Sequence, residues 1–247
     1  MPEILVADDG PIRTVRLNRP DKKNALTWPM YQALTAALGE RRPGLRCLVL
    51  AGHETGFCAG NDIGDFLAAS AQGGELGAPT ADFLHVLAGC ETPIVAAVSG
   101  AAVGIGVTML MHCDHVVAAS DARLSTPFVA LGLLPEAGST LIAPRLMGYA
   151  RAFELLVMGH PLSAEEAKAA GLVNRVVASA ELEAAALAAA REIAALPPES
   201  VSMARQLMRG ALDQTLARID REVEIFRERL GSPEAIAAFK AFLARKK

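Results

Sequence analysis

At 247 residues the chain is long enough for one large domain or two small ones with a substantial buried core. Its composition, 52% hydrophobic and 21% charged, is that of a folded globular protein and excludes an intrinsically disordered chain. The formal net charge of −3 gives no indication of a nucleic-acid-binding protein.

The N-terminal segment predicts a β-hairpin followed by a helix and a buried strand. Residues 4–8 and 12–18 are strand-like and flank an Asp-Gly pair, which is typical of a tight hairpin turn. Thr27 is in position to cap a helix, because a proline two residues later suits a first helical turn. Residues 46–51 form a short apolar run and predict a buried strand.

The middle of the chain alternates helices with strands, which predicts an α/β fold. In chain order we expect a helix at 62–70, a mobile surface loop at 72–79 (QGGELGAP), a helix at 81–90, a strand at 94–98, a helix at 106–112 and a strand at 115–119. Residues 94–111 carry no charge and are just long enough to flag as membrane-spanning. Glycines and polar flanks indicate a buried strand, a loop and a buried helix there instead.

The C-terminal part begins with a capping box, Ser163-Ala-Glu-Glu166, and a short helix that Gly171 closes before a strand at 172–177. A Leu-Pro-Pro sequence then precedes a region that looks entirely helical, so we expect a division into residues 1–195 and 196–247. One helix in this region carries a heptad-like apolar seam, formed by Leu212, Leu216, Ile219, Val223, Phe226 and Leu230. The seam packs either on the chain's own core or on another subunit.

Two glycine-rich loops are the most informative features of the chain. Each follows an apolar, strand-like run and opens a helix: GHETGFCAGNDI at residues 52–63, and SGAAVGIGVTMLMHCD at residues 99–114. Glycine permits a sharp turn and a close approach of another molecule to the backbone. Two such loops can aim free backbone N–H groups at one point and form an oxyanion hole. Glycine spacing alone equally fits close packing of a helix on a strand.

The letters of these segments resemble those of a known family. FCAGNDI, AAVGIGVTMLMHCD and TPFVALGLLPEAGST (residues 126–140) are similar to the signature segments of the crotonase (enoyl-CoA hydratase/isomerase) superfamily. NRPDKKNAL (residues 18–26) and GHPLSAEEAKAAGLVNRVV (residues 159–177) fit the same family in the same order, so the resemblance covers almost the whole chain. Within the superfamily, AGND, AVGIGVT and PEAG resemble the Δ3,Δ2-enoyl-CoA isomerase branch more than the hydratases.

The resemblance implies a crotonase-like spiral of ββα units with a C-terminal all-helical oligomerisation region. It also implies a homotrimer or a hexamer built as a dimer of trimers, which favours the interface interpretation of the seam. The implied substrate is an acyl-CoA thioester in fatty-acid or related acyl-CoA degradation. Coenzyme A is then part of the substrate, and no separate cofactor is expected.

By the same resemblance, the oxyanion donors are the backbone N–H groups of Asn61 and Ile105, and the single catalytic base is Glu136. Considered alone, Glu136 also suits the first turn of a helix, where a negative charge is favourable for the helix dipole. Catalysis requires that an apolar pocket raise its pKa. The expected walls of that pocket are Phe128, Leu131, Leu133 and Leu134.

Hydration requires two carboxylates that hold one water molecule. The hydratases of this family carry them at positions that match Thr108 and Phe128, and neither side chain can act as an acid or a base. Three alternatives to isomerisation stay open: hydration of an unusual substrate, another crotonase-type reaction such as thioester hydrolysis, and a non-catalytic acyl-CoA-binding protein.

The resemblance also places the coenzyme A part of the substrate. The segments expected along it contribute Lys22, Lys23, Ala25, Ala59, Gly60, Asp62, Ile63 and Gly104. Phe239 matches an aromatic residue that reaches the coenzyme A of a neighbouring subunit. The basic residue that follows three positions later in some family members is Phe242 here. Lys22 and Lys23 equally fit a solvated surface.

The remaining polar residues predict structural roles. His53 and His112 have no partner at metal-ligand spacing, so we expect no metal. Asp114 and His115 predict a cap and a turn rather than a site. The four cysteines are scattered, and we expect them reduced. With no signal peptide visible and ARKK at the C-terminus, we expect a cytoplasmic protein without membrane or nucleic-acid partners.

Overall fold

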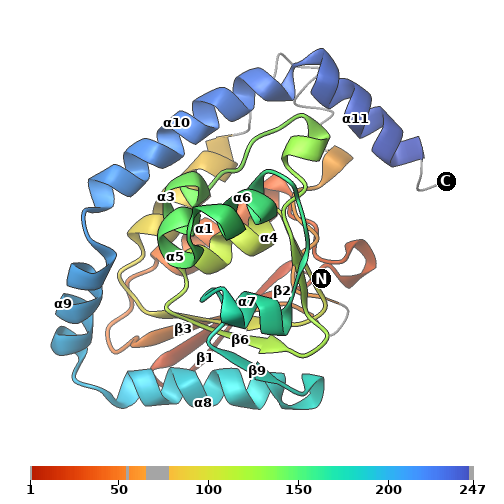
Figure 1. The fold of residues 1–247 in the computed structure, drawn as a ribbon. Helices are drawn as coiled ribbons and strands as arrows, with labels where there is room; N and C mark the ends of the chain where they lie inside the picture. Colours follow the sequence, from red (N-terminus) through yellow and green to blue (C-terminus); the bar gives the residue numbers. More distant parts are fainter. Residues whose placement is uncertain (1, 54–55, 65–77, 245–247) are drawn as a thin grey trace.

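The computed structural model of the chain describes residues 2–53, 56–64 and 78–244 (Figure 1). Its larger sheet has the strand order β1-β2-β3-β4-β6-β9. These strands are β1 (Ile4–Asp9), β2 (Ile12–Leu17), β3 (Cys47–Ala51), β4 (Ile94–Val98), β6 (His115–Ala119) and β9 (Arg175–Val177). β1 and β2 are antiparallel, as the predicted hairpin requires, and the remaining neighbours are parallel.

A second, smaller sheet consists of β5 (Ala101–Val103), β7 (Arg123–Ser125) and β8 (Leu162–Ser163). β5 pairs with β7 in parallel, and β7 pairs with β8 in antiparallel fashion. Only Ser99 and Gly100 separate β4 of the large sheet from β5 of the small one. Gly100 has a φ of +51°, a conformation that glycine adopts without strain. The chain therefore passes abruptly from one sheet to the other at the second glycine-rich loop.

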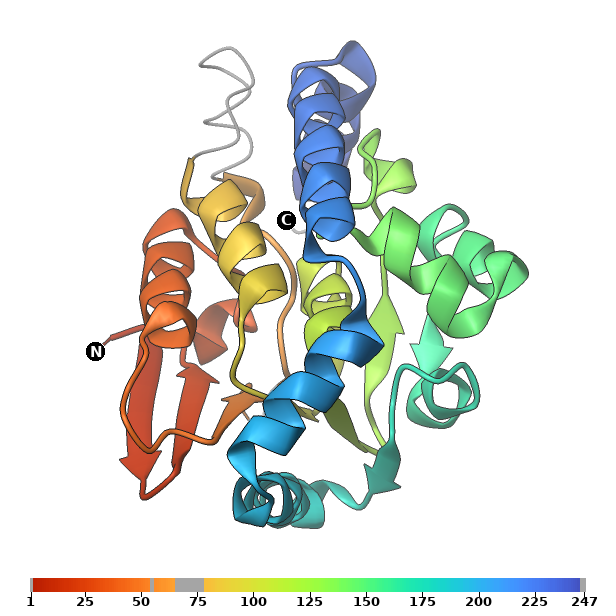
Figure 2. The ribbon, with the colours of Figure 1, turned by 90° about the vertical axis from the view of Figure 1, so that its left-hand side faces the viewer.

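The helices surround the two sheets. The α-helices are α1 (Trp28–Gly39), α3 (Ala78–Gly89), α4 (Ile105–Thr108), α5 (Ser139–Met147), α6 (Tyr149–Leu156), α7 (Ala164–Ala169), α8 (Leu182–Ala195), α9 (Pro198–Arg209), α10 (Leu212–Leu230) and α11 (Pro233–Ala244). The 3₁₀ turns are η1 (Pro20–Lys22), η2 (Met109–His112), η3 (Val129–Leu131) and η4 (Ser179–Glu181). Figures 1 and 2 show α8 to α11 in an arc that passes under the large sheet and around the core.

Alternation along the strands divides the core into two layers, because successive side chains of a strand point to opposite faces of the sheet. Leu48 and Leu50 of β3 belong to the cluster that also holds buried residues of α1 and α3. Val49 and Ala51 of the same strand belong to the cluster on the other face, which α8 covers. Both faces of β3 are thus buried, which accounts for its unbroken apolar run.

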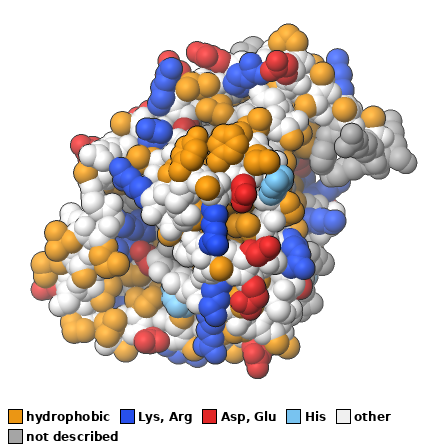
Figure 3. Space-filling view, in the orientation of Figure 1, with side chains coloured by type: hydrophobic (Ala, Val, Ile, Leu, Met, Phe, Trp, Pro, Cys, Tyr) orange, Lys and Arg blue, Asp and Glu red, His pale blue; other side chains and the backbone are white. Residues whose placement is uncertain are grey.

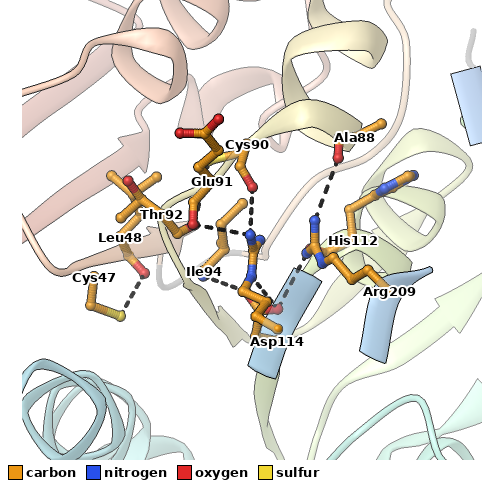
Figure 4. A network of polar contacts seen from close by, with 11 residues as sticks. Cys47, Leu48, Ala88, Cys90, Glu91, Thr92, Ile94, His112, Asp114 and Arg209 are labelled. Carbon is orange, nitrogen blue, oxygen red and sulfur yellow. Dashed lines mark hydrogen bonds and ion pairs between the residues drawn. The ribbon is translucent and has the colours of Figure 1, made fainter. Parts of the chain in front are cut away.

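An aspartate–arginine cluster ties α9 to the core (Figure 4). The Asp114 carboxylate accepts hydrogen bonds from Arg205 Nε at 2.7 Å and from the Ile94 backbone N–H at 2.8 Å. Arg209 Nη2 lies 3.3 Å from the same carboxylate, and Arg205 Nη1 also donates to the Cys90 carbonyl at 2.7 Å. Asp114 therefore has a structural role, as predicted, but its carboxylate binds the start of β4 and two arginines from beyond the Leu-Pro-Pro sequence rather than a helix end.

The C-terminal seam packs largely on the chain's own core. Ile219, Val223, Phe226 and Leu230 are buried, while Leu212 is exposed. Other apolar side chains of this region face outward: Leu207 and Met208 of α9 are 84% and 87% exposed. Figure 3 shows this apolar area on α9 and a second one over α6. The residues of the second area are Leu146, Tyr149, Phe153, Val157 and Met158.

Several predicted elements differ from the observed ones in extent. The predicted helix 106–112 is a four-residue α-helix followed by a 3₁₀ turn. The predicted strand 172–177 narrows to β9, because the N–H groups of Leu172 and Val173 donate to the Ala167 carbonyl and close α7. The capping box at Ser163 is confirmed. Thr27 stands at the N-cap of α1, but its hydroxyl hydrogen-bonds to the Glu3 carboxylate rather than to the helix backbone.

The segment between β3 and β4 is described only in part. Most of the predicted helix 62–70 and residues 72–77 of the predicted loop lie outside the described residues. The last two residues of that loop prediction are helical, because α3 begins at Ala78. Within the described residues, no helix combines the length and the apolar character needed to cross a membrane.

Candidate active site

The two glycine-rich loops lie side by side, joined by backbone hydrogen bonds. Cys58 N–H donates to the Ala101 carbonyl at 3.0 Å, and Val103 N–H donates to the Cys58 carbonyl at 2.8 Å. A Cβ atom at Gly106 would lie 2.7 Å from the Cys58 carbonyl oxygen, closer than such atoms approach. Glycine is therefore required at position 106 for the two loops to approach each other. The same close packing of the backbones brings the two loops together at one place.

Both predicted oxyanion donors lie on these joined loops. Ile105 is the first residue of α4, and the N–H groups of a first helical turn have no acceptor within their own helix. Gly104 precedes it with φ +56° and ψ −117°, a conformation that other residues avoid. Asn61 forms a parallel β-bridge with Leu26. In this bridge Leu26 N–H donates to the Gly60 carbonyl, and Asp62 N–H donates to the Leu26 carbonyl. The N–H of Asn61 itself therefore points away from Leu26.

Tyr31 of α1 fixes the Asn61 side chain. Its hydroxyl donates a hydrogen bond to Asn61 Oδ1, and the tyrosine ring is fully buried. Burial and the charges of Glu136 and Cys58 together hold the pKa of Tyr31 well above its ordinary value of 10.0, so the hydroxyl stays protonated. Sequence reasoning missed this residue, because a tyrosine on the apolar face of a helix looks like any other core side chain.

Glu136 is buried, with only 4% of its surface exposed. Its Oε1 accepts a hydrogen bond from the Thr108 hydroxyl at 2.6 Å. Its Oε2 is buried and has no hydrogen-bond partner within the described residues. Burial raises the pKa of Glu136 from 4.5 to about 8; the Thr108 hydrogen bond lowers it, and the negative charge of Glu222 raises it. One oxygen of this carboxylate is thus held and the other is open to a proton.

The helix-dipole explanation for Glu136 is wrong. Helix α5 begins at Ser139 with Gly138 at its N-cap, so Glu136 precedes the first turn. The glutamate lies on a turn in which Ala137 and Gly138 both have positive φ, +64° and +68°. A left-handed conformation is uncommon for alanine and indicates a turn that its surroundings hold in place.

Two buried side chains hold this turn. His112 Nε2 lies 2.7 Å from the Ala137 carbonyl oxygen. Burial lowers the pKa of His112 to about 4, so the ring is neutral and donates from Nε2. The Glu222 carboxylate of α10 accepts hydrogen bonds from Gly138 N–H at 2.6 Å and from Thr140 N–H at 3.0 Å. The structural role predicted for His112 is confirmed.

Sequence reasoning missed Glu222. It lies three residues after Ile219 and four before Phe226, so it occupies a helical position inside the apolar stripe of α10. A lone acid within such a stripe signals a buried carboxylate that needs partners.

The two positions at which hydratases carry their carboxylates serve other purposes here. Thr108 is fully buried and donates to Glu136. The Phe128 ring lies 3.7 Å from the Cβ position of Gly104. Phe128, with the other expected wall residues, belongs to an apolar cluster that α10 and α11 complete. The members of that cluster from the expected walls are Phe128, Leu131, Leu133 and Leu134.

The residues predicted along the coenzyme A come from two segments that lie together. Ala59 N–H donates to the Lys23 carbonyl at 2.9 Å, and Asp62 N–H donates to the Leu26 carbonyl at 2.9 Å. These two hydrogen bonds join the segment that contains Lys22, Lys23 and Ala25 to the segment that contains Gly60 and Ile63. Lys22 and Lys23 are exposed. Asp62 forms an ion pair with Arg19 at 2.7 Å, a partner that sequence reasoning did not identify.

Phe239 does not reach the surface of the chain. It is fully buried within the chain's own apolar cluster, beside Phe128 and Phe226. Among the described residues, no group of three or more histidine, cysteine or acidic side chains is arranged to hold a metal ion.

The chain is similar to known proteins over almost its whole length. Residues 8–247 match the sequence family described as enoyl-CoA hydratase/isomerase. Enoyl-CoA delta isomerase 2 of Rattus norvegicus is 36% identical over 249 residues, which are 98% of this chain and 64% of the rat protein. A probable enoyl-CoA hydratase of Rhizobium meliloti is 36% identical over 253 residues, 99% of this chain and 96% of that protein. The solved structure of Pseudomonas aeruginosa OdaA superposes with a TM-score of 0.92 at 41% identity and covers 98% of each chain.

Proposed function

The chain belongs to the enoyl-CoA hydratase/isomerase (crotonase) family, and we propose that within this family it is a Δ3,Δ2-enoyl-CoA isomerase with Glu136 as its single base. One observation carries the proposal: the buried Glu136 carboxylate, with one oxygen that has no hydrogen-bond partner among the described residues, lies beside Thr108, and both hydratase positions hold side chains that are not acids, Thr108 and Phe128. An enzyme that moves a double bond needs one base, whereas an enzyme that adds water in the manner of the hydratases needs two.

The chemistry begins at the thioester carbonyl. Removal of a proton from C2 of a 3-enoyl thioester gives a dienolate whose negative charge lies on the thioester oxygen. The backbone N–H groups of Asn61 and Ile105 are the proposed donors to that oxygen, because both belong to the joined glycine loops. Backbone donors leave the side chains at these two positions free to serve other purposes.

Glu136 then carries the proton between the two carbons. Its Oε2 takes the proton from C2 and returns it at C4, which yields the conjugated 2-enoyl thioester. The Thr108 hydroxyl holds Oε1 in both states of the carboxyl group and so keeps Oε2 directed to the acyl chain. A pKa of about 8 suits this double role, since a base near neutrality both accepts and returns a proton readily.

The environment of Glu136 argues against a purely binding protein. A buried carboxyl without a cationic partner is unfavourable for folding, and such groups cluster at sites of chemistry. No lysine or arginine contributes to the pKa shift of Glu136. The presence of the Glu136 carboxyl group in the interior, despite this cost, supports a catalytic role.

We also propose that the enzyme binds the coenzyme A of its substrate along Lys22, Lys23, Ala25 and the 59–63 segment, and that it assembles as a homotrimer or a dimer of trimers. The exposed apolar side chains of α9, among them Leu207 and Met208, support the assembly, because exposed apolar patches mark contact surfaces. The buried place of Phe239 gives no support to its predicted contact with a neighbour's coenzyme A.

The test is a pair of assays, on trans-3-hexenoyl-CoA and on crotonyl-CoA, that follow the ultraviolet absorbance of the conjugated thioester. We expect a rise with the first substrate and no loss with the second. Rapid loss of absorbance with crotonyl-CoA would mean hydration and would refute the single-base assignment. Absence of change with both, in a protein that still binds acyl-CoA, would refute isomerisation of straight-chain 3-enoyl thioesters.

A further inference from the structure

Helix α10 brings a second carboxylate into the interior beside the first. Glu222 is 2% exposed and accepts three hydrogen bonds: from Gly138 N–H at 2.6 Å, from Thr140 N–H at 3.0 Å and from the Thr140 hydroxyl at 2.6 Å. A buried carboxylate is tolerated only when its oxygens are satisfied by donors. Burial raises the pKa of Glu222, whereas these donors lower it and so favour the ionised form of the carboxyl group.

The donors come from the turn that carries Glu136 and from the start of α5. The first N–H groups of a helix need acceptors, and here a side chain 84 residues further along the chain supplies them. The turn itself includes two successive residues with positive φ, Ala137 and Gly138. Such a conformation persists only where neighbouring groups hold it. A Cβ atom at Gly138 would lie 3.4 Å from Thr215 and 3.5 Å from Ile219, so α10 also packs closely on the turn.

We propose that Glu222 is a positioning residue for Glu136: by holding the backbone at Gly138 and Thr140, it keeps the 136–138 turn in the conformation that presents Oε2 of Glu136 to the acyl chain. The proposal rests on the proposed role of Glu136 as the base. It makes the C-terminal helical region a part of the active-site architecture rather than only a surface for assembly.

The charges around the turn agree with this role. Glu136 is faced by Thr108 from α4, by Tyr31 from α1, by Cys58 of the first glycine loop and by Glu222 from α10. His112, which contacts the same turn, is neutral. The negative charge of Glu222 raises the pKa of Glu136, and Arg218, one turn earlier on α10, faces Glu222 and the Thr140 hydroxyl instead. Glu222 therefore acts on Glu136 both through the backbone and through its charge.

The decisive variant is Glu222→Gln, because glutamine has nearly the same shape and removes the charge. Its amide NH2 group would face a backbone N–H, so at least one of the three hydrogen bonds is lost. Glu224→Gln is the matched control, since Glu224 lies on the same helix, is exposed and pairs with Arg221. Thermal unfolding establishes that both variants are folded before any other comparison.

The first readout needs no substrate. Difference infrared spectroscopy follows the carboxyl band of Glu136 as a function of pH, with Glu136→Gln used to assign the band. We expect the titration midpoint of Glu136 to move to lower pH in Glu222→Gln and to stay unchanged in Glu224→Gln. An unchanged midpoint in folded Glu222→Gln would overturn the proposal. Because the measurement involves no turnover, it distinguishes this proposal from the proposed isomerase activity.

The second readout is kinetic, with 3-hexenoyl-CoA as substrate. We expect kcat to fall about 10- to 100-fold in Glu222→Gln, with KM within about threefold, because a small misplacement of a catalytic group has that effect. Thr140→Val removes one of the three donors and leaves the charge of Glu222 in place. It should lower kcat several-fold, and Thr140→Ser should restore it. Equal kcat in wild type and Thr140→Val would contradict the positioning role even if Glu222→Gln did not fold.

Discussion

Asp114 and Glu136 are two carboxylates near one short segment, residues 105–112, and their surroundings differ in kind: Asp114 follows the segment in sequence, and Glu136 accepts a hydrogen bond from its Thr108. Asp114 has two arginine partners and a backbone N–H, and it ties α9 to β4. Glu136 has a threonine hydroxyl, a second carboxylate in its vicinity and no cationic partner in the part of the chain that the structure describes. Positively charged partners therefore surround Asp114, which holds two elements of the fold together, but they do not contribute to the surroundings of Glu136.

The different partners of Asp114 and Glu136 suit one carboxylate to stabilising the fold and the other to proton transfer. Two arginines and a backbone N–H hold the Asp114 carboxylate in a fixed network that links α9 to β4. Burial without a cation favours the neutral form and brings the pKa of Glu136 to about 8, where proton transfer in both directions is easy. Changes at Glu136 should therefore affect rate, and changes at Asp114 should affect folding.

Glu136→Gln gives the largest expected effect. We expect kcat on 3-hexenoyl-CoA to fall by about 10²- to 10⁴-fold, because the variant lacks the proposed base. Binding of acyl-CoA should persist, since glutamine keeps the shape of the side chain. Steady-state kinetics and a binding titration measure the two quantities. Glu165→Gln, at an exposed position of α7, is the control, and retention of activity in Glu136→Gln would remove Glu136 from the mechanism.

The same variant also has an expected pH-dependent stability. In the unfolded chain Glu136 ionises above about 4.5, whereas in the folded chain it keeps its proton up to about 8. The folded state therefore binds more protons in this window, and the wild type loses stability as pH rises through it. Urea unfolding from pH 5 to pH 8 should show Glu136→Gln becoming more stable relative to wild type. A constant difference across this range would contradict the raised pKa.

Asp114→Ala is the counterpart in the other region. It leaves Arg205 and Arg209 without their carboxylate and Ile94 N–H without its acceptor, so we expect the free energy of unfolding to fall by about 3 kcal/mol. Asp9→Ala breaks an exposed ion pair with Arg191 and should cost less than about 1 kcal/mol. Urea unfolding measures both. The kcat of folded Asp114→Ala should stay within about threefold of wild type.

Thr108→Val sharpens the description of the catalytic region. The hydroxyl donates to the ionised carboxylate, and its loss disfavours the charged form, so the pKa of Glu136 should rise further. We expect the rising limb of kcat/KM near pH 8 in the wild type, and in Thr108→Val it should move up by about one pH unit. Thr108→Ser should return it toward the wild-type position. A limb that moves to lower pH would reverse the assigned role of this hydrogen bond.

Tyr31→Phe is expected to have the smallest effect. It removes the hydroxyl that holds the Asn61 side chain but leaves the Asn61 backbone in its bridge to Leu26. We expect kcat to fall by about threefold to tenfold, with the pH profile unmoved. A shift of the profile would show that the tyrosine acts on Glu136 rather than on Asn61.

The fold was largely predictable because local patterns decide most of its elements. The strand 94–98 was placed at its observed bounds by its apolar run, and the start of α7 by the capping box at Ser163. The helix α10 followed from the spacing of its apolar seam. The prediction failed at Thr27 and at residues 172 and 173 because other partners bind these groups. The Thr27 hydroxyl bonds to Glu3, and the N–H groups of Leu172 and Val173 donate to the Ala167 carbonyl.

The site was predictable only in the residues that stand in continuous motifs. Glu136, Asn61 and Ile105 were proposed from the resemblance, and their roles stay predictions. The partners that shape the site were missed: Tyr31 meets Asn61 across 30 residues, and Glu222 meets Gly138 across 84. Neither contact has a local pattern, since each depends on how distant elements pack. The arginines that hold Asp114 lie more than 90 residues from it for the same reason.

The distance between Glu222 and Gly138 along the chain also sets an order of events during synthesis. The ribosome makes the protein from its N-terminus, so the turn that carries Glu136 emerges before the acceptor for its backbone exists. At about 5–20 residues per second, the 84 intervening residues take several seconds to follow. The sheets and their covering helices can form during that interval. The turn that carries Glu136 is therefore without its Glu222 acceptor until α10 has been synthesised.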